Sequence, residues 1–99
     1  MATNPLDVVK KLDASLFDLV EKTRSLALGD GALPKKVKFL IAMALDAEHG
    51  AVGGVKALAQ AAMQAGATKQ EVAEALRVAQ YIGGVGTVYI AAQALEGIV

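Results

Sequence analysis

Hydrophobic residues recur along this chain at the three- and four-residue spacing of helices that bury one face. No stretch alternates apolar and polar residues in the manner of a strand. The pattern therefore predicts an all-α fold of about five helices. We expect them to run from Asn4-Pro5 to Ser25 or Leu26, from Leu33-Pro34 to His49, from Ala51 or Val52 to Gln64, from Thr68 to the glycines at 83–86, and from about Thr87 to Glu96.

The most definite helix boundary is Gly66 followed by Thr68-Lys-Gln-Glu71. Gly66 suits the left-handed position that ends a helix. Thr68 and Glu71 have the spacing of a capping box, in which each side chain accepts a backbone N–H of the other residue. This pattern predicts that one helix stops and the next one starts within a few residues.

The second expected helix has two unusual features. Lys35, Lys36 and Lys38 crowd its first turn, where we expect them to point to water, with attraction of an anion to the helix start as the alternative. Every residue in 39–45 is apolar, and a helix that is hydrophobic all round is buried all round. We therefore expect this segment to contact a neighbouring subunit as well as its own domain.

Composition supports self-association. A chain of 99 residues forms a single domain, 1–99, and its hydrophobic content of 55% exceeds the usual 45–50% or so. A small domain commonly hides such a surplus in a subunit interface. The segment from Val78 to Leu95 has no charged residue, but its glycines and glutamines favour a helical pair buried in an oligomer over a membrane span.

Charge and cysteine content exclude several classes of function. Ten basic residues balance ten acidic ones, so no positive field exists to gather nucleic acid. The chain has no cysteine, which excludes disulfides, thiolate nucleophiles and zinc–thiolate sites. The first residues lack the pattern of a signal peptide, and we expect a cytoplasmic protein with no cofactor and no metal.

Three segments resemble the carboxymuconolactone decarboxylase and alkylhydroperoxidase D (AhpD) family. They are Lys38-Phe-Leu-Ile-Ala-Met-Ala44, Ala65-Gly-Ala-Thr-Lys-Gln-Glu-Val-Ala-Glu-Ala-Leu76, and Gly83-Gly-Val-Gly before an Ala-rich terminal helix. The resemblance covers about residues 33–95. It implies an AhpD-like helical bundle that assembles as a trimer or a hexamer.

The resemblance does not extend to the redox residues. The family's Cys-x-x-Cys-x-x-x-His set aligns with Ala51, Gly54 and Leu58, and its acidic residue aligns with Phe39. Peroxide reduction by a thiol needs a thiolate and a resolving partner, so we expect no thiol peroxidase activity. The chain is then expected to be a non-redox binding or structural oligomer, for a small apolar or carboxylate-bearing ligand.

The alternative is a non-thiol decarboxylase or lyase acting on a small carboxylate. His49, the single histidine, stands three residues after Asp46 and next to Glu48, so a carboxylate could hold its imidazole as an acid/base unit. Ligand contact and helix capping are the other interpretations of His49.

Three further residues are candidates for contacting a ligand. Lys56 could take a substrate carboxylate or pair with Asp46 or Glu48, but a solvated lysine is the simpler interpretation. Tyr81 and Tyr89 flank the glycines at 83–86, and we expect buried tyrosines with hydrogen-bonded tips, or a hydroxyl in a pocket. We also expect the glycines near Ala51 and those near Gly83 to pack close together around a small pocket.

Overall fold

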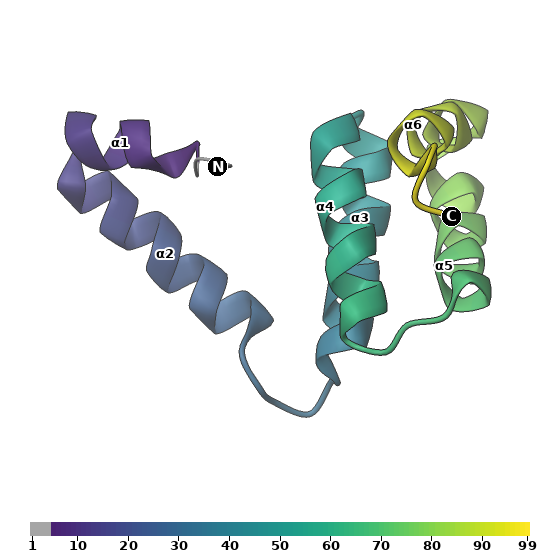
Figure 1. Cartoon of the computed structure of the whole chain (residues 1–99), viewed down its shortest axis with the longest axis horizontal. Coiled ribbons are helices and arrows are strands. Elements are labelled where there is room, and N and C mark those ends of the chain that lie inside the picture. Colours follow the sequence, from purple (N-terminus) through teal and green to yellow (C-terminus); the bar gives the residue numbers. More distant parts are fainter. Residues whose placement is uncertain (1–4) are drawn as a thin grey trace.

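The computed structural model describes residues 5–99, so the expected role of Asn4 at the first helix start lies outside the described residues. Within that range the chain is all-α and forms six helices, which confirms the expected fold class. They are α1 (Leu6–Leu12), α2 (Ala14–Leu28), α3 (Lys35–His49), α4 (Val52–Gln64), α5 (Lys69–Gly83) and α6 (Val85–Leu95). Helices α3–α6 form a bundle, and α1 and α2 form an arm that leaves it at the base of α3 (Figure 1).

The first expected helix is two helices. Asp13 interrupts it with an extended backbone (φ −155°, ψ 97°), and its Oδ1 accepts the backbone N–H of Leu16 at 3.1 Å. Asp13 is therefore the N-cap of α2. The hydrophobic spacing continues across this break, which is why periodicity alone predicts one helix.

The hydrophobic core belongs to the bundle alone. Met43 and Val55 are its largest fully buried side chains, and neither α1 nor α2 contributes a buried residue. Most other core positions are alanines, which let helix backbones approach closely. Met43 lies in this core, and the partly buried Met63 packs against it.

Glycines and one capping box set the corners of the bundle. Gly50 ends α3 with φ +82°, and Gly66 follows α4 with φ +105°. In both corners the residue after the glycine donates its N–H back to the helix, Ala51 to the Asp46 carbonyl and Ala67 to the Ala62 carbonyl, each at 2.9 Å. These bonds define Schellman caps.

The predicted capping box is present at the start of α5. The Thr68 backbone N–H donates to Glu71 Oε1 at 2.9 Å, and the Glu71 N–H donates to Thr68 Oγ1 at 3.0 Å. The same carboxylate pairs with Lys36, whose Nζ lies 3.0 Å from Glu71 Oε2. These interactions, led by the Thr68 backbone bond, lower the pKa of Glu71 below its ordinary value.

The lysines of α3 therefore do not all point to water. Lys36 ties the start of α3 to the start of α5, and Lys38 Nζ donates to the Gly29 carbonyl at 2.6 Å. Among the three, only Lys35 is exposed, and Lys36 and Lys38 are partly buried. The expectation that these lysines point to water is thus wrong for Lys36 and Lys38. The fold places the Glu71 carboxylate next to Lys36 and the Gly29 carbonyl next to Lys38.

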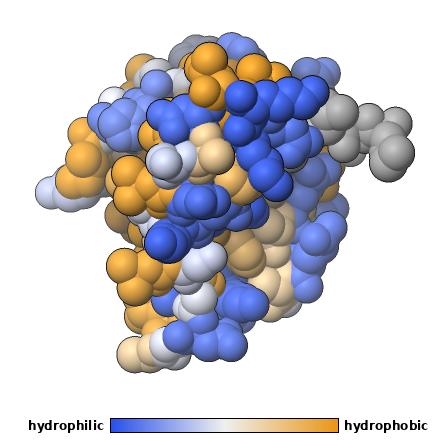
Figure 2. Space-filling view, turned by 90° about the vertical axis from the view of Figure 1, so that its left-hand side faces the viewer, coloured by the Kyte–Doolittle hydropathy of each residue, from blue (hydrophilic) through white to orange (hydrophobic). Residues whose placement is uncertain are grey.

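The arm makes the chain more extended than a compact domain of its size. The radius of gyration is 14.3 Å, against about 12.6 Å for a compact domain of this length. Figure 2, which faces the arm side, shows hydrophobic surface open to solvent beside hydrophilic side chains. The accessible surface is 6763 Å², more than about 1,000 Å² above the value typical of a folded monomer of this mass.

The uncharged segment from Val78 to Leu95 is divided between α5 and α6 at Gly84, where φ is +85°. No helix within residues 5–99 is long and apolar enough to cross a membrane. Several apolar side chains of this segment face solvent, including Val78, Ile82 and Val88.

Candidate functional site

The corner between α3 and α4 positions the three acid/base candidates. The left-handed Gly50 reverses the chain direction, so the last turn of α3, which carries Asp46, Glu48 and His49, lies beside the first turn of α4. Since these side chains project from one helical turn in different directions, the question is which of them meet.

Asp46 packs on α4. A Cβ built on Gly54 would lie 2.9 Å from Asp46 Cγ and would overlap its Oδ2, so the carboxylate fits only because position 54 has no side chain. Gly54 is one of the two positions expected from the resemblance to correspond to the family's cysteines. The partly buried carboxylate of Asp46 thus fills space that a side chain at 54 would need.

Glu48 faces α5. A Cβ built on Gly83 would lie 2.8 Å from Glu48 Cγ, so the absence of a side chain at 83 lets α5 approach the end of α3. The two glycine regions near Ala51 and Gly83 therefore lie on two sides of one helix end. They each contact α3, which stands between them.

His49 lies near Glu48. Its Nε2 is 3.8 Å from Glu48 Oε2, and the two side chains are 73% and 43% exposed. At this distance they form an ion pair when the imidazole is protonated, and the separation is too long for a hydrogen bond. Within the described residues Asp46 forms no ion pair with His49, because Asp46 is directed toward Gly54.

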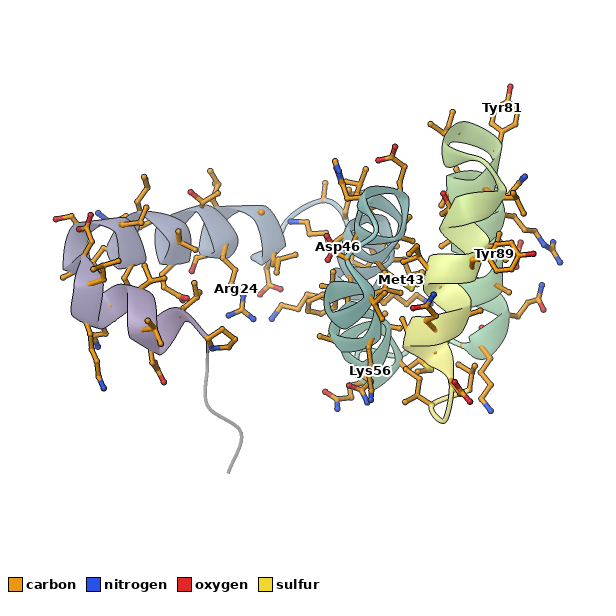
Figure 3. All side chains as sticks on the ribbon, turned by 90° about the horizontal axis from the view of Figure 1, so that it is seen from above. Arg24, Met43, Asp46, Lys56, Tyr81 and Tyr89 are labelled. Carbon is orange, nitrogen blue, oxygen red and sulfur yellow. The ribbon has the colours of Figure 1, made fainter. Side chains whose placement is uncertain are left out.

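The other two candidates, Lys56 and Tyr81, do not join this group. Figure 3 shows Lys56 and Tyr81 at opposite sides of the bundle. Lys56 is exposed on α4 and forms no ion pair with Asp46 or Glu48 in the described chain. The side chains of Tyr81 and Tyr89 are 83% and 68% exposed, so the expectation of buried tyrosines is wrong.

An apolar groove between α3 and α5 was not predicted. Its volume is about 250 Å³, and Glu48 is its one charged lining residue. The groove is lined by Ile41, Ala44, Leu45, Glu48, Val78, Ala79 and Ile82. A four-residue spacing on each helix, 41 and 45 on α3 and 78 and 82 on α5, could have revealed it. On α3 that signal is masked, because every residue in 39–45 is apolar and no polar face stands out.

The segment 39–45 is only partly buried. Met43 is inaccessible to solvent, whereas Ile41 and Leu45 remain about half exposed. These two residues also line a second apolar hollow of about 300 Å³, together with Ala27, Leu28 and Leu33 at the base of the arm. Ile41 and Leu45 thus form an apolar ridge between two hollows.

No group of three or more His, Cys, Asp or Glu side chains within residues 5–99 is placed to hold a metal ion. The positions expected from the resemblance to correspond to the family's redox residues are Ala51 and Gly54 at the start of α4, Leu58 one turn later, and Phe39 on α3. What the corner offers chemically is one exposed Glu48–His49 pair and one packed carboxylate, Asp46.

Comparison with known proteins agrees with this architecture. The model of the carboxymuconolactone decarboxylase family matches residues 14–97, which begins at α2 and includes the whole bundle. A search of curated proteins returns no match. The crystal structure of apo-lpg0406, a carboxymuconolactone decarboxylase family protein from Legionella pneumophila, is similar, with a TM-score of 0.85 and 36% sequence identity over 92% of this chain and 81% of that chain. From the extent of the family match and the six-helix architecture, this cysteine-free chain belongs to the carboxymuconolactone decarboxylase family.

Proposed function

We propose that this chain is a non-redox member of its family that acts as a homo-oligomeric binding or structural protein. The observation that carries the proposal is the apolar surface that the single chain leaves uncovered. None of the residues of α1 and α2 is buried, and the α3–α5 groove is open. Exposed apolar surface of this extent is typical of a face that binds a partner.

The absence of cysteine removes the thiol reaction. No thiolate can attack a peroxide, and no second thiol can resolve a sulfenic acid. The positions that align with the family's cysteines instead accommodate a packed carboxylate, Asp46, beside Gly54. We therefore expect no consumption of hydrogen peroxide above the rate without protein when a thiol reductant is supplied.

Subunit number is the direct test of the proposal. Light scattering after gel filtration should give three or six times the chain mass of 10.1 kDa, as the family resemblance implies. The measurement is repeated over a hundredfold dilution series, because association depends on concentration. A mass of one chain at every concentration would contradict the oligomer.

A small ligand of this protein is expected to be apolar. The α3–α5 groove has an almost entirely apolar lining, and its one charge, Glu48, repels a carboxylate. Lys56, the candidate for binding a carboxylate, is on α4 and does not line this groove. The structure therefore favours the apolar alternative over a carboxylate-bearing ligand for this groove.

The second candidate function is a non-thiol decarboxylase or lyase on a small carboxylate. The Glu48–His49 pair supports it, since a carboxylate 3.8 Å from the imidazole places two groups that can transfer protons side by side. The test is carbon dioxide release from carboxymuconolactone by the wild-type chain and by His49→Ala. Because His49 is exposed, this variant should keep its melting temperature. Release that is absent from the wild type, or unchanged in His49→Ala, would reject the role of His49.

A further inference from the structure

Helix α2 carries an unpaired apolar stripe. Leu16, Leu19, Thr23 and Leu26 follow one another at spacings of three, four and three residues, the pattern of a helix seam that packs against other helices. The three leucines are 44%, 61% and 86% exposed. Phe17, on another face of α2, and Val20, at the edge of the stripe, are partly buried, whereas the three leucines stay exposed.

The α3–α5 groove has walls that match this stripe. Ile41 and Leu45 form one wall and Val78 and Ile82 the other, and these four side chains are 48–76% exposed. The stripe spans ten residues, or about 15 Å, and the α3 wall from Ile41 to Glu48 spans about 11 Å. An apolar helix face in a groove between two helices is a common mode of protein recognition.

Charge also agrees at the edges of the two surfaces. Lys22 flanks the stripe between Leu19 and Leu26. Of the positions immediately beside the stripe, which are 15, 20, 22 and 27, only 22 carries a charged residue. Glu48 is the one charged residue of the groove. Opposite charges at the rim of an apolar contact set its register more than its strength.

The chain's own arm does not reach the groove. Its base is held by the bond from Lys38 Nζ to the Gly29 carbonyl, and Ala27 and Leu28 of α2 line the hollow beside α3. From that base the arm diverges from the bundle, as Figure 1 shows. The part of α2 that carries Leu16 and Leu19 thus lies away from its own α5, and a second copy can present its stripe without breaking this bond.

The uncovered surface has the size that a pair of copies needs. The accessible area exceeds that of a compact monomer by more than about 1,000 Å², while a standard interface buries about 800 Å² on each partner. Figure 3 shows the arm and the bundle as separate bodies with side chains projecting from both. Two copies that exchange arms would cover both surfaces at once.

We infer that the α2 stripe of one copy binds the α3–α5 groove of a second copy, so that neighbouring chains exchange their arms. This inference rests on the proposed oligomer and specifies which surfaces meet. It also assigns the groove to a protein helix, which leaves a small apolar molecule as a competitor for the same site.

Cysteine cross-linking provides a clean test, because the chain has no cysteine of its own. Leu19→Cys and isotope-labelled Val78→Cys chains are mixed, oxidised and analysed by non-reducing electrophoresis and mass spectrometry. We expect a disulfide-linked dimer of one labelled and one unlabelled chain. Leu16→Cys and Leu26→Cys sample neighbouring registers of the stripe.

Two matched controls define the background. Asp18→Cys replaces an exposed residue of α2 outside the stripe, and Lys56→Cys replaces an exposed residue of α4 outside the groove. Each control should give at least tenfold less mixed dimer with its partner. Equal yields from Asp18→Cys and Leu19→Cys would overturn the stripe as the contact surface.

The remaining outcomes separate this inference from the proposed oligomer. A monomer mass by light scattering contradicts both. An oligomer that cross-links Leu19→Cys to itself, or that fails to cross-link any stripe position to Val78→Cys, contradicts arm exchange alone. A Leu19→Cys/Val78→Cys chain that closes an internal disulfide while monomeric shows the arm in its own groove and also overturns the inference.

A charge exchange gives a readout that does not depend on added cysteines. Lys22→Glu and Glu48→Lys should each weaken association about two- to fivefold, the range for exposed ion pairs. The double variant should recover the wild-type dissociation constant. Additive weakening in the double variant would show that Lys22 and Glu48 do not meet.

Discussion

Replacing Gly54 by alanine tests how closely the end of α3 packs on α4. The added Cβ would lie 2.9 Å from Asp46 Cγ, overlap its Oδ2, and approach the Ala51 Cβ at 3.6 Å. Gly53, the preceding residue in the same turn of α4, has no heavy atom within 4 Å of an added Cβ. Gly53→Ala is therefore a control with the same chemical change and no clash.

The difference between the two variants isolates the clash. Alanine is preferred over glycine in a helix by about 0.5–1 kcal/mol, and this gain applies to both positions. Overpacking at position 54 costs about 1–3 kcal/mol. We expect Gly53→Ala to raise the free energy of unfolding and Gly54→Ala to lower it, with a gap of about 2 kcal/mol. For a domain of this size that gap corresponds to about 10 °C in melting temperature.

Thermal unfolding followed by circular dichroism, at one fixed chain concentration, measures the gap. Asp46→Ala added to Gly54→Ala should restore much of the loss, since the two positions share one space and should not act additively. Equal melting temperatures for Gly53→Ala and Gly54→Ala would refute the packing of Asp46 against Gly54. Additive effects of Asp46→Ala and Gly54→Ala would refute it as well.

Three further predictions concern the core, the α5 cap and the arm. Met43→Ala should lower the free energy of unfolding by about 2–5 kcal/mol in urea denaturation, and the partly buried Met63→Ala should cost clearly less. The pKa of Glu71 is lowered in the folded chain, so its carboxylate stabilises the fold above about pH 4.5, and this stabilisation is lost as the pH falls. When the free energy of unfolding is measured at decreasing pH, Glu71→Gln should lose less stability than the wild type. Asp13→Ala removes the N-cap of α2, which should cost about 1 kcal/mol locally and speed amide hydrogen exchange in the first turn of α2, while leaving exchange in the bundle unchanged.

Helix boundaries were predictable where a local signal marks them. Gly66 and the Thr68–Glu71 box depend on residues within one turn of each other, and the structure confirms both. The break at Asp13 also has a local signal, an aspartate before Ala-Ser-Leu16. It was missed because the apolar spacing continues through it, and spacing describes which face is buried but not where the backbone turns.

Contacts at the end of α3 were less predictable. Helical spacing suggested that His49 would meet Asp46, but Gly54 admits Asp46 to α4 and Gly83 brings Glu48 against α5. The tyrosines illustrate the same limit. Tyr81 and Tyr89 are in an apolar segment, yet both residues are mostly exposed in the single chain. Neither outcome follows from spacing within one helix.

The sequence by itself determined the all-α class, the capped corners and the absence of thiol chemistry. The all-α class follows from side-chain periodicity, and the capped corners follow from short-range backbone hydrogen bonding. The absence of thiol chemistry follows from an amino-acid composition without cysteine. The tertiary structure decided which apolar residues form the core and which, such as Ile82 and Leu19, remain uncovered. A hydrophobic pattern predicts that one face of a helix is buried. The identity of the surface that covers it depends on distances between helices that lie far apart in the chain.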